Sequence, residues 1–424
     1  MKILWITNIS IGDMAIGKPM GGLWMDALLK EIKKEKEFSF VIVTSNNSKS
    51  LEHKNIDGIQ YYAVPGGLPV HYKRDTKIAY NEWKEIFEIE KPDVIHVWGT
   101  EYSHAVPALE VAKDLKIPSV IYIQGILRAI SRFATGQLPF FKMLKYTTLR
   151  DIYRSQLLAF QNNWFKNRAK TEERLISLSG SVVVENKWAE YFCKSINPEI
   201  RVFKIPLNIN KEFSQHTWSV STMHPHTIIS NASGPAYKGI HILLEALLII
   251  RRRFPDVKLF IPGKSMIVSG GHINRQKVPG YWNYISDFIR NNDLGENVIF
   301  TGYLTQKELA EKLSQANVFA MASSIENHSS SLKEAMAVGT PSVASQVGGV
   351  PEYFNFGDTG FSYRFEEYEC LAGYICELFE DTELCLKFSN ASKKKSDEID
   401  GIEITKKIIS MYKILSQKDY LHES

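Results

Sequence analysis

The sequence lacks several features that mark common protein classes. Its 424 residues contain four cysteines, and none of them has the C-x2-C spacing of a zinc site. We therefore expect free thiols in a reducing cytoplasm. No stretch reaches the roughly 18 apolar residues that a membrane-spanning helix needs. The formal net charge of +4 is too small to indicate nucleic-acid binding by itself.

What is present fits a two-domain α/β protein. The length exceeds that of a typical single domain, and the apolar fraction of 44% is ordinary for a globular chain. Short apolar runs, which are typical of buried parallel strands, alternate with helical segments. The clearest predicted strands span residues 2–6, 94–98, 119–123, 227–230, 257–261, 298–302, 318–322 and 342–345.

The stretch from Ser323 to Glu352 is the most informative part of the chain. A predicted buried strand is followed by a loop of small polar residues and then by a short helix. Backbone N–H groups and the helix dipole can hold a phosphate at such a helix N-terminus. Ser331 and Glu334 have the spacing of a capping box, which predicts the helix start, and Gly339 predicts its end.

Two carboxylates lie on either side of this loop. Glu326 is at the carboxyl end of the predicted strand, and Glu334 is in the first turn of the predicted helix. One carboxylate could meet a sugar and the other a ribose, on opposite sides of a bound phosphate. Alternatively, Glu334 only caps its helix and Glu326 is a solvated loop residue.

These residues resemble the E-x7-E signature of the family 4 glycosyltransferases, which have the GT-B fold. The runs Glu334-Ala335-Met336-Ala337-x-Gly339-Thr340-Pro341 and Gly348-Gly349-x-Pro351-Glu352 match that family as well. The resemblance implies that Glu326 contacts the transferred sugar and that Glu334 takes the ribose hydroxyls. It also implies that the donor is held by His328, Ser329, Ser330, Ser331 and Leu332. The family usually has glycine at the position of Asn327, whose side chain could narrow or re-aim the sugar pocket.

Further positions in the second half carry the same resemblance. Lys238-Gly239 matches the family's Lys-Gly pair, whose lysine binds the donor phosphates and offsets the charge of the leaving group. A cation at a helix N-terminus opposes the dipole, so Lys238 should have another reason to be present. The family usually has arginine where this chain has Ser233, and it contacts the nucleotide base where this chain has Tyr303 and Leu304.

The candidates in the first half follow predicted strands, because open α/β sheets bind ligands at the carboxyl ends of their strands. The resemblance places Gly21 and Gly22 against the donor diphosphate, and the alternative is a flexible loop. Glu101 and His104 lie in the family's acceptor-side segment and are the catalytic candidates there. The family often has histidine where this chain has Gln124, so we expect no general base at that point.

Residues 127–174 form a basic, largely helical segment with interleaved aromatic side chains. Its ten basic residues face only three acidic residues, Asp151, Glu172 and Glu173. A basic, amphipathic segment with aromatic residues suits an anionic membrane surface. The alternative is a soluble helix pair with a solvated basic face. Nucleic-acid binding is less favoured, because no recognised motif accompanies the charge.

The resemblance implies an α/β chain with the GT-B fold, in which two Rossmann-like domains face a central cleft. The first domain is expected at residues 1–206, on the acceptor side and with the basic excursion 127–174. The nucleotide-sugar-binding domain is expected at residues 207–395. Residues 396–424 would form a C-terminal helix that crosses back to the first domain.

The expected activity is transfer of a sugar from a nucleotide-sugar donor to a glycan or lipid-linked acceptor, with retention, in bacterial surface-polysaccharide biosynthesis. No metal and no cofactor are expected, because no D-x-D-type carboxylate pair ends a strand and Lys238 with the helix amides would supply the phosphate-binding charge. We expect a location in the cytoplasm, including the inner face of the cell membrane, and no nucleic-acid partner. The alternatives are a GT-B sugar-nucleotide epimerase and a catalytically silent nucleotide-sugar-binding subunit. Sugar transfer to any acceptor would discriminate between them.

Overall fold

The computed structural model describes residues 1–9, 11, 23–207, 209–267, 271–400 and 403–417. By their contacts these residues form two compact units. Unit 1 consists of the described parts of 1–128, 166–208 and 403–424, and unit 2 of those of 129–165 and 209–402. The predicted glycines of the first loop, Gly21 and Gly22, lie outside the described residues.

Unit 1 is built on an eight-stranded sheet with the order β3-β4-β2-β1-β5-β6-β7-β8. Its strands are β1 (Lys2–Ile6), β2 (Ser39–Asn46), β3 (Glu52–Ile56), β4 (Ile59–Pro65), β5 (Val94–Trp98), β6 (Ser119–Tyr122), β7 (Ser181–Val184) and β8 (Arg201–Lys204). Neighbouring strands are parallel except for the edge pair β3–β4. The central strands β5, β6 and β7 are buried throughout, which is why their sequences are near-continuous apolar runs.

The helices of unit 1 are α1 (Leu23–Ile32), η2 (Pro69–His71), α2 (Thr76–Glu90), α3 (Ala105–Asp114), α7 (Gln161–Leu178), α8 (Lys187–Ile196) and α17 (Ile404–Ser416). The last of these, α17, packs into the unit through Tyr412. The Trp5 indole donates a hydrogen bond to Tyr412 Oη at 2.9 Å, and His96 Nδ1 lies 2.7 Å from the same oxygen. Burial lowers the pKa of His96 to about 3, so this strand residue is a neutral member of the core.

Unit 2 is built on a six-stranded parallel sheet with the order β11-β10-β9-β12-β13-β14. Its strands are β9 (His224–Ile229), β10 (Lys258–Pro262), β11 (Val298–Gly302), β12 (Ala316–Met321), β13 (Ser342–Ser345) and β14 (Phe361–Tyr363). The strand order reverses between β9 and β12. Open α/β sheets bind ligands at the carboxyl ends of the strands next to such a reversal.

The helices of unit 2 are α4 (Leu127–Phe133), which starts at the end of unit 1, then α5 (Phe140–Lys145), α6 (Leu149–Tyr153), η3 (Leu158–Phe160), α9 (Lys211–Gln215), η4 (Ala236–Lys238), α10 (Ile240–Arg253), α11 (His272–Arg275), α12 (Gly280–Asn291), α13 (Gln306–Gln315), α14 (Ser330–Val338), η5 (Val350–Glu352), α15 (Tyr368–Glu380) and α16 (Thr382–Asp400). None of the helices in the described ranges is long and apolar enough to cross a membrane.

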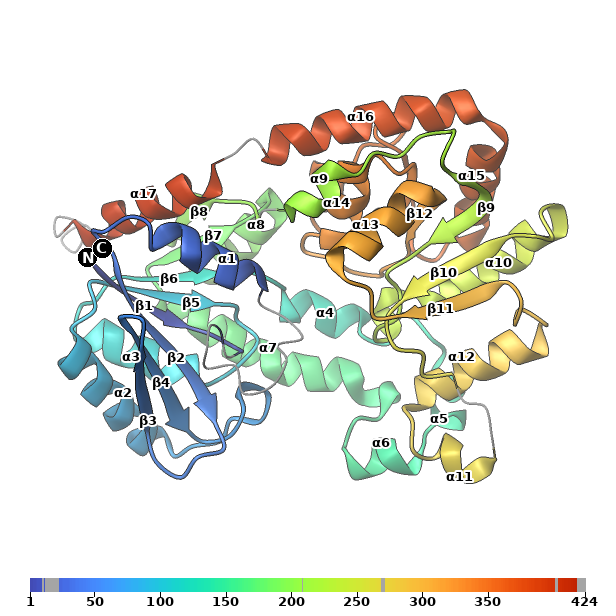
Figure 1. Ribbon diagram of the computed structural model, residues 1–424. Coiled ribbons are helices and arrows are strands. Elements are labelled where there is room, and N and C mark those ends of the chain that lie inside the picture. Colours follow the sequence, from blue (N-terminus) through green and yellow to red (C-terminus); the bar gives the residue numbers. More distant parts are fainter. Residues whose placement is uncertain (10, 12–22, 208, 268–270, 401–402, 418–424) are drawn as a thin grey trace. The chain divides into compact units, whose positions relative to one another are not determined.

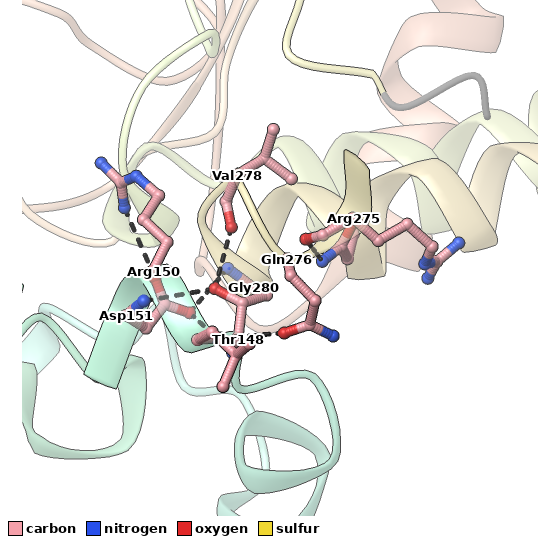
Figure 2. Close-up of polar contacts among 9 residues, drawn as sticks. Thr148, Arg150, Asp151, Arg275, Gln276, Val278 and Gly280 are labelled. Carbon is pink, nitrogen blue, oxygen red and sulfur yellow. Dashed lines mark hydrogen bonds and ion pairs between the residues drawn. The ribbon is translucent and has the colours of Figure 1, made fainter. Parts of the chain in front are cut away.

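The division of the chain differs from the predicted domains in residues 129–165. The sequence placed them as an excursion of the first domain, whereas their contacts place them in unit 2. Leu138, Met143 and Leu158 of this segment are buried in the hydrophobic core of unit 2. In addition, Asp151 Oδ2 accepts a hydrogen bond from Gly280 N at 2.8 Å, and Thr148 Oγ1 donates to the Val278 carbonyl at 2.9 Å (Figure 2). The long helical segment that we predicted is therefore several short helices held against α11 and α12, followed by α7.

Candidate active site

Two oppositely charged side chains meet where the sheet of unit 2 reverses its strand order. Lys238 ends the 3-10 turn η4, which follows β9, and Glu326 lies in the loop after β12. Lys238 Nζ lies 2.5 Å from Glu326 Oε1, which also accepts a hydrogen bond from Ser323 Oγ at 2.6 Å. Burial alone would lower the pKa of Lys238, but the nearby carboxylate outweighs it and the pKa is raised. The lysine is therefore charged at neutral pH.

The position of Lys238 depends on the glycine that follows it. Gly239 has φ +74, in the left-handed region, and it both ends η4 and begins α10. A Cβ at this position would lie 1.7 Å from the carbonyl oxygen of Ala322, at the carboxyl end of β12. Only glycine therefore allows the chain to approach β12 this closely and to bring Lys238 to Glu326. The Lys-Gly pair of the sequence thus has a structural reason.

Helix α14 begins two residues earlier than the capping-box spacing predicted. Its N-cap is Ser329, whose Oγ accepts a hydrogen bond from Leu332 N at 3.3 Å. The Ser329 amide in turn donates to Tyr353 Oη at 3.1 Å, which fixes the cap residue. The predicted cap at Ser331 is therefore wrong. The predicted end is confirmed, because Gly339 is left-handed with φ +83 and its amide bonds the carbonyls of the last turn.

The start of α14 leaves backbone donors for a ligand. The amides of Ser330 and Ser331 have no acceptor in the part of the chain that the structure describes. Such amides, together with the helix dipole, favour an anion at this end of the helix. Of the predicted loop residues, Ser330 is exposed, His328 and Ser331 are half-buried, and Ser329 and Leu332 are buried.

The earlier helix start changes the interpretation of Glu334. With Ser329 as the cap, this residue lies in the second turn of α14 and not in the first. Desolvation raises the pKa of its half-buried carboxyl group to about 7, and within the described ranges no side chain or amide bonds to it. Glu334 therefore does not cap its helix. Its carboxyl group is a hydrogen-bond acceptor without a partner among the described residues.

The aromatic ring of His328 gives the loop between the glutamates a fixed wall. It stacks on Tyr353 with 4.4 Å between ring centroids and 14° between their planes. Asn327, at the position where we expected an effect on the sugar pocket, is itself buried. The double-glycine turn also reaches this loop, since the Gly349 amide donates to the carbonyl of Glu326 at 3.3 Å. The motif at residues 348–352 therefore helps to hold the loop between the two glutamates in place.

The other predicted donor residues follow the neighbouring strands. Ser233 lies in the loop after β9, where a Cβ added to Gly263 would come within 2.3 Å of its Oγ. The Gly263 amide donates to the carbonyl of Gly302 at 2.7 Å, so the ends of β10 and β11 are joined. Tyr303 and Leu304 follow the end of β11 directly. Tyr303 is exposed and Leu304 is half-buried. The structure thus brings these residues to the same sheet edge as Lys238.

In unit 1, the predicted acceptor-side residues have internal partners. Glu101 Oε2 accepts a hydrogen bond from Asn8 Nδ2 at 3.1 Å, the Arg168 guanidinium donates to the Glu101 carbonyl, and burial raises the pKa of its carboxyl group. His104 is fully buried, with Nε2 3.1 Å from the carbonyl of Thr7, and burial lowers its pKa to about 4. Because its side chain is fully buried, we do not include His104 in our proposal.

Sequence reasoning missed the buried carboxyl group of Glu172 on α7. It accepts hydrogen bonds from the amides of Leu127 and Arg128 at 2.9 and 3.0 Å and from Thr100 Oγ1 at 3.1 Å. Desolvation raises its pKa to about 7. The only sequence signal was an acidic residue within a basic helix. No group of three or more His, Cys, Asp or Glu side chains that could hold a metal is found in the described ranges.

Comparison with known proteins gives one matching family model and several similar proteins. A family model described as "Glycosyl transferases group 1" matches residues 218–395, which lie in unit 2. The chain is 28% identical over 131 residues to N-acetyl-alpha-D-glucosaminyl L-malate synthase of Bacillus anthracis, covering 31% of this chain and 33% of that protein. It is 24% identical over 362 residues to Alpha-monoglucosyldiacylglycerol synthase of Streptococcus pneumoniae, covering 82% of this chain and 73% of that protein.

Among solved structures, Anabaena Alr3699/HepE in complex with UDP and glucose has a TM-score of 0.63 to this chain. The sequence identity is 17%, and the likeness covers 98% of this chain and 100% of the other. At that identity the likeness shows the fold, which is the GT-B architecture of two parallel-sheet α/β units. The match to the Bacillus enzyme spans only a third of that protein's length.

Proposed function

This chain is a member of the group 1 glycosyltransferases, matched through residues 218–395, and we propose that it transfers a sugar from a nucleotide-sugar donor to an acceptor hydroxyl with retention. The observation that carries the proposal is the pairing of Lys238 with Glu326 at the strand reversal, next to unpartnered amides at the start of α14. This edge combines a cation, helix amides and a carboxylate. Such a site fits a sugar diphosphate better than it fits a dinucleotide or a simple phosphate.

In the proposed complex, the donor diphosphate lies between Lys238 and the start of α14. The lysine charge and the Ser330 and Ser331 amides stabilise the negative charge that develops on the leaving phosphate. A bound phosphate can take the place of the Glu326 carboxylate beside Lys238. The carboxylate is then free to accept hydrogen bonds from hydroxyls of the transferred sugar. Glu334 accepts those of the ribose, because hydroxyl donors would supply the partners that its carboxyl group lacks.

The chemical step breaks the bond between the anomeric carbon and the phosphate oxygen and forms a bond to the acceptor oxygen on the same face. The acceptor proton passes to an oxygen of the leaving diphosphate, so no protein nucleophile or base is needed. We propose that no metal and no cofactor takes part, because Lys238 and the helix amides supply the charge. Ser233, Tyr303 and Leu304 complete the donor side of the site.

On the acceptor side, we propose that unit 1 contributes Glu101, which is half-buried in the loop after β5. The acceptor would be a glycan or a lipid-linked sugar in polysaccharide biosynthesis. One relative over most of this chain is named as a synthase of a glucosyl diacylglycerol, which supports an acceptor attached to lipid. The enzyme would then work in the cytoplasm, at the inner face of the membrane.

The test is a panel of nucleotide-sugars offered to the full chain with soluble glycan and lipid-linked acceptors. We expect one donor to raise the midpoint of thermal unfolding, because a ligand that binds only the native state stabilises it. That donor should give a glycosylated product whose anomeric configuration, measured by NMR, matches the donor's, with equal rates in buffer and in EDTA. Inverted configuration, or a rate that EDTA abolishes, would contradict the mechanism. Donor binding without any transfer would favour the silent subunit.

A further inference from the structure

Exposed apolar side chains are concentrated in one short part of unit 2. Between residues 140 and 160 the large apolar residues that remain exposed are Phe140, Phe141, Leu144, Leu149, Ile152, Tyr153 and Phe160. Phe141 is 83% and Tyr153 90% exposed. Single exposed apolar residues are ordinary on a soluble protein, but a contiguous group marks a surface that meets a partner.

Helix α6 shows that this exposure is built into the fold. Its polar residues face inward: Thr148 and Asp151 are buried and form a capping box. Its apolar residues Leu149, Ile152 and Tyr153 are exposed, so the helix has the reverse of the usual arrangement. A helix with solvent as its only neighbour on that side would gain nothing from three apolar residues there.

The contacts that α6 makes near α11 and α12 prevent α6 from rotating about its own axis. Asp151 bonds the Gly280 amide, and the Leu149 amide donates to Gln276 Oε1 at 2.9 Å (Figure 2). Gly280 also allows a close approach, since a Cβ there would lie 2.1 Å from the carbonyl oxygen of Tyr146. Rotating α6 to bury its apolar side would leave the Asp151 carboxylate and the Gly280 amide without partners, which is costly.

The exposed charged side chains of residues 129–165 all have one sign. Residues 129–165 contain five basic residues and one acidic residue, and that acid is the buried Asp151. The exposed cations are Arg132, Lys142, Lys145 and Arg154. The neighbouring α11 adds Ile273, which is 73% exposed, while the adjacent Arg275 is paired with Asp287 at 2.7 Å. The exposed side chains of residues 129–165 therefore include apolar residues and cations but no acidic residue.

We propose that α5, α6 and Ile273 of α11 form a docking surface for a membrane that contains anionic lipid. The phospholipid interface offers negative head groups and an apolar layer together over a continuous area, which is what this face complements. Figure 1 draws the three helices in the same part of unit 2; α6 bonds Gln276, just after α11, and Lys142 of α5 lies over the ring of Tyr284 on α12. Docking on a membrane favours a lipid-linked sugar as the acceptor of the proposed function. This identity of the acceptor rests on the proposed function, whereas the docking itself does not.

The test is co-sedimentation of the full chain with vesicles of phosphatidylcholine alone or mixed with phosphatidylglycerol. We expect binding to the mixed vesicles that falls as salt is raised, because salt screens the cations. Lys145→Ala/Arg154→Ala should weaken binding roughly 30-fold, since each basic residue near an anionic surface contributes about 1 kcal/mol. Ile152→Ser/Tyr153→Ser should remove the part of the binding that resists salt.

Matched variants on α2 of unit 1 serve as controls. Lys77→Ala/Lys84→Ala removes two exposed cations, and Ile78→Ser/Ile89→Ser removes two exposed apolar side chains. Both should bind vesicles like the wild type. Donor binding by thermal shift should be unchanged in all four variants, which shows that they are folded.

Three outcomes would overturn the docking surface. The first is equal binding to neutral and mixed vesicles, and the second is a loss of vesicle binding in the α2 variants as large as in the variants of the docking surface. The third is a change of oligomeric state in Ile152→Ser/Tyr153→Ser without a change in vesicle binding. The last outcome would assign the face to a second copy of the chain. Transfer to a soluble acceptor without vesicle binding would contradict the docking surface but not the proposed function. Vesicle binding without any transfer would leave the docking and contradict the proposed function.

Discussion

The two units use charged side chains in opposite ways at the carboxyl ends of their central strands. In unit 2, Lys238 and Glu326 pair with each other at a partly exposed edge, and Glu334 has no partner among the described residues. In unit 1, the acidic groups of Glu101 and Glu172 already accept hydrogen bonds from their own surroundings. A position after a strand is therefore not enough to indicate a ligand site. The edge of unit 2 differs because it combines a cation with helix amides that have no acceptor among the described residues.

The largest effect that would sharpen this contrast is expected from Lys238→Ala. Turnover at saturating donor should fall by about 10²–10³-fold, because the lysine stabilises charge that develops on the leaving phosphate. The matched control is Lys258→Ala, which removes a lysine of the same unit whose Nζ donates to the carbonyl of Glu296 and to no other described residue. If Lys238→Ala stayed within about threefold of the wild type, roughly 0.65 kcal/mol, the phosphate role would be wrong.

The next effect concerns stability and belongs to unit 1. The folded-state pKa of Glu172, about 7, lies above its ordinary value of 4.5, so the folded protein holds this proton where the unfolded chain has lost it. The contribution to the free energy of unfolding therefore falls as pH rises from about 4.5 to 7, by roughly 3 kcal/mol. Glu172→Gln should remove this part of the pH dependence.

The measurement is the urea midpoint at pH 5 and pH 8 for wild type, Glu172→Gln and the control Glu173→Gln. Glu173 is the neighbouring residue, and its partly exposed side chain pairs with Arg128 at 3.4 Å. Its replacement should leave the pH dependence as in the wild type. A wild-type dependence that persists in Glu172→Gln would show that this carboxyl group does not titrate as the structure indicates.

A smaller effect is expected from Glu334→Gln on nucleotide binding. Loss of a charged acceptor for ribose hydroxyls should weaken the binding of a nucleoside diphosphate roughly 10- to 100-fold, since a hydrogen bond to a charged group contributes about 1.5–3 kcal/mol. The thermal stability of the free protein should not fall, because Glu334 has no partner to lose among the described residues. Calorimetry that gave an unchanged affinity would refute the ribose role.

The smallest effect is expected from His104→Gln. Its side chain is fully buried against the carbonyl of Thr7, so it should not touch substrate. Turnover should stay within about threefold of the wild type, and the pH–rate profile should keep its shape. Loss of one limb of that profile would restore His104 as an acid or base and would break the contrast between the units.

How far the sequence predicts this fold depends on whether the signal is local. Strands β1, β5, β11 and β13 lie where the sequence predicted them. For β1 and β5 the signal is a near-continuous apolar run, because a parallel strand covered on both faces is buried. The end of α14 is equally local, since Gly339 supplies the left-handed residue. These elements needed no knowledge of tertiary contacts.

The errors come from contacts between distant residues. Ser329, Ser330 and Ser331 can each cap a helix, and the choice of Ser329 is supported by a bond from its amide to Tyr353. Residues 129–165 belong to unit 2 because their apolar residues enter its core and Asp151 bonds the amide of Gly280, 129 positions later in the chain. Neither contact leaves a pattern in its own segment. The candidate site could be proposed from the E-x7-E and Lys-Gly motifs, but the meeting of Lys238 and Glu326 could not.

The central claim is that the edge beside Lys238 and the start of α14 binds the diphosphate of the donor. The most direct measurement is a calorimetric titration of a panel of nucleoside diphosphates into wild type, Lys238→Ala and Lys258→Ala. The account predicts that at least one of them binds the wild type and Lys258→Ala with equal affinity, and that Lys238→Ala loses this binding. Binding that is unchanged in Lys238→Ala, or no binding of any nucleoside diphosphate to the wild type, would contradict it.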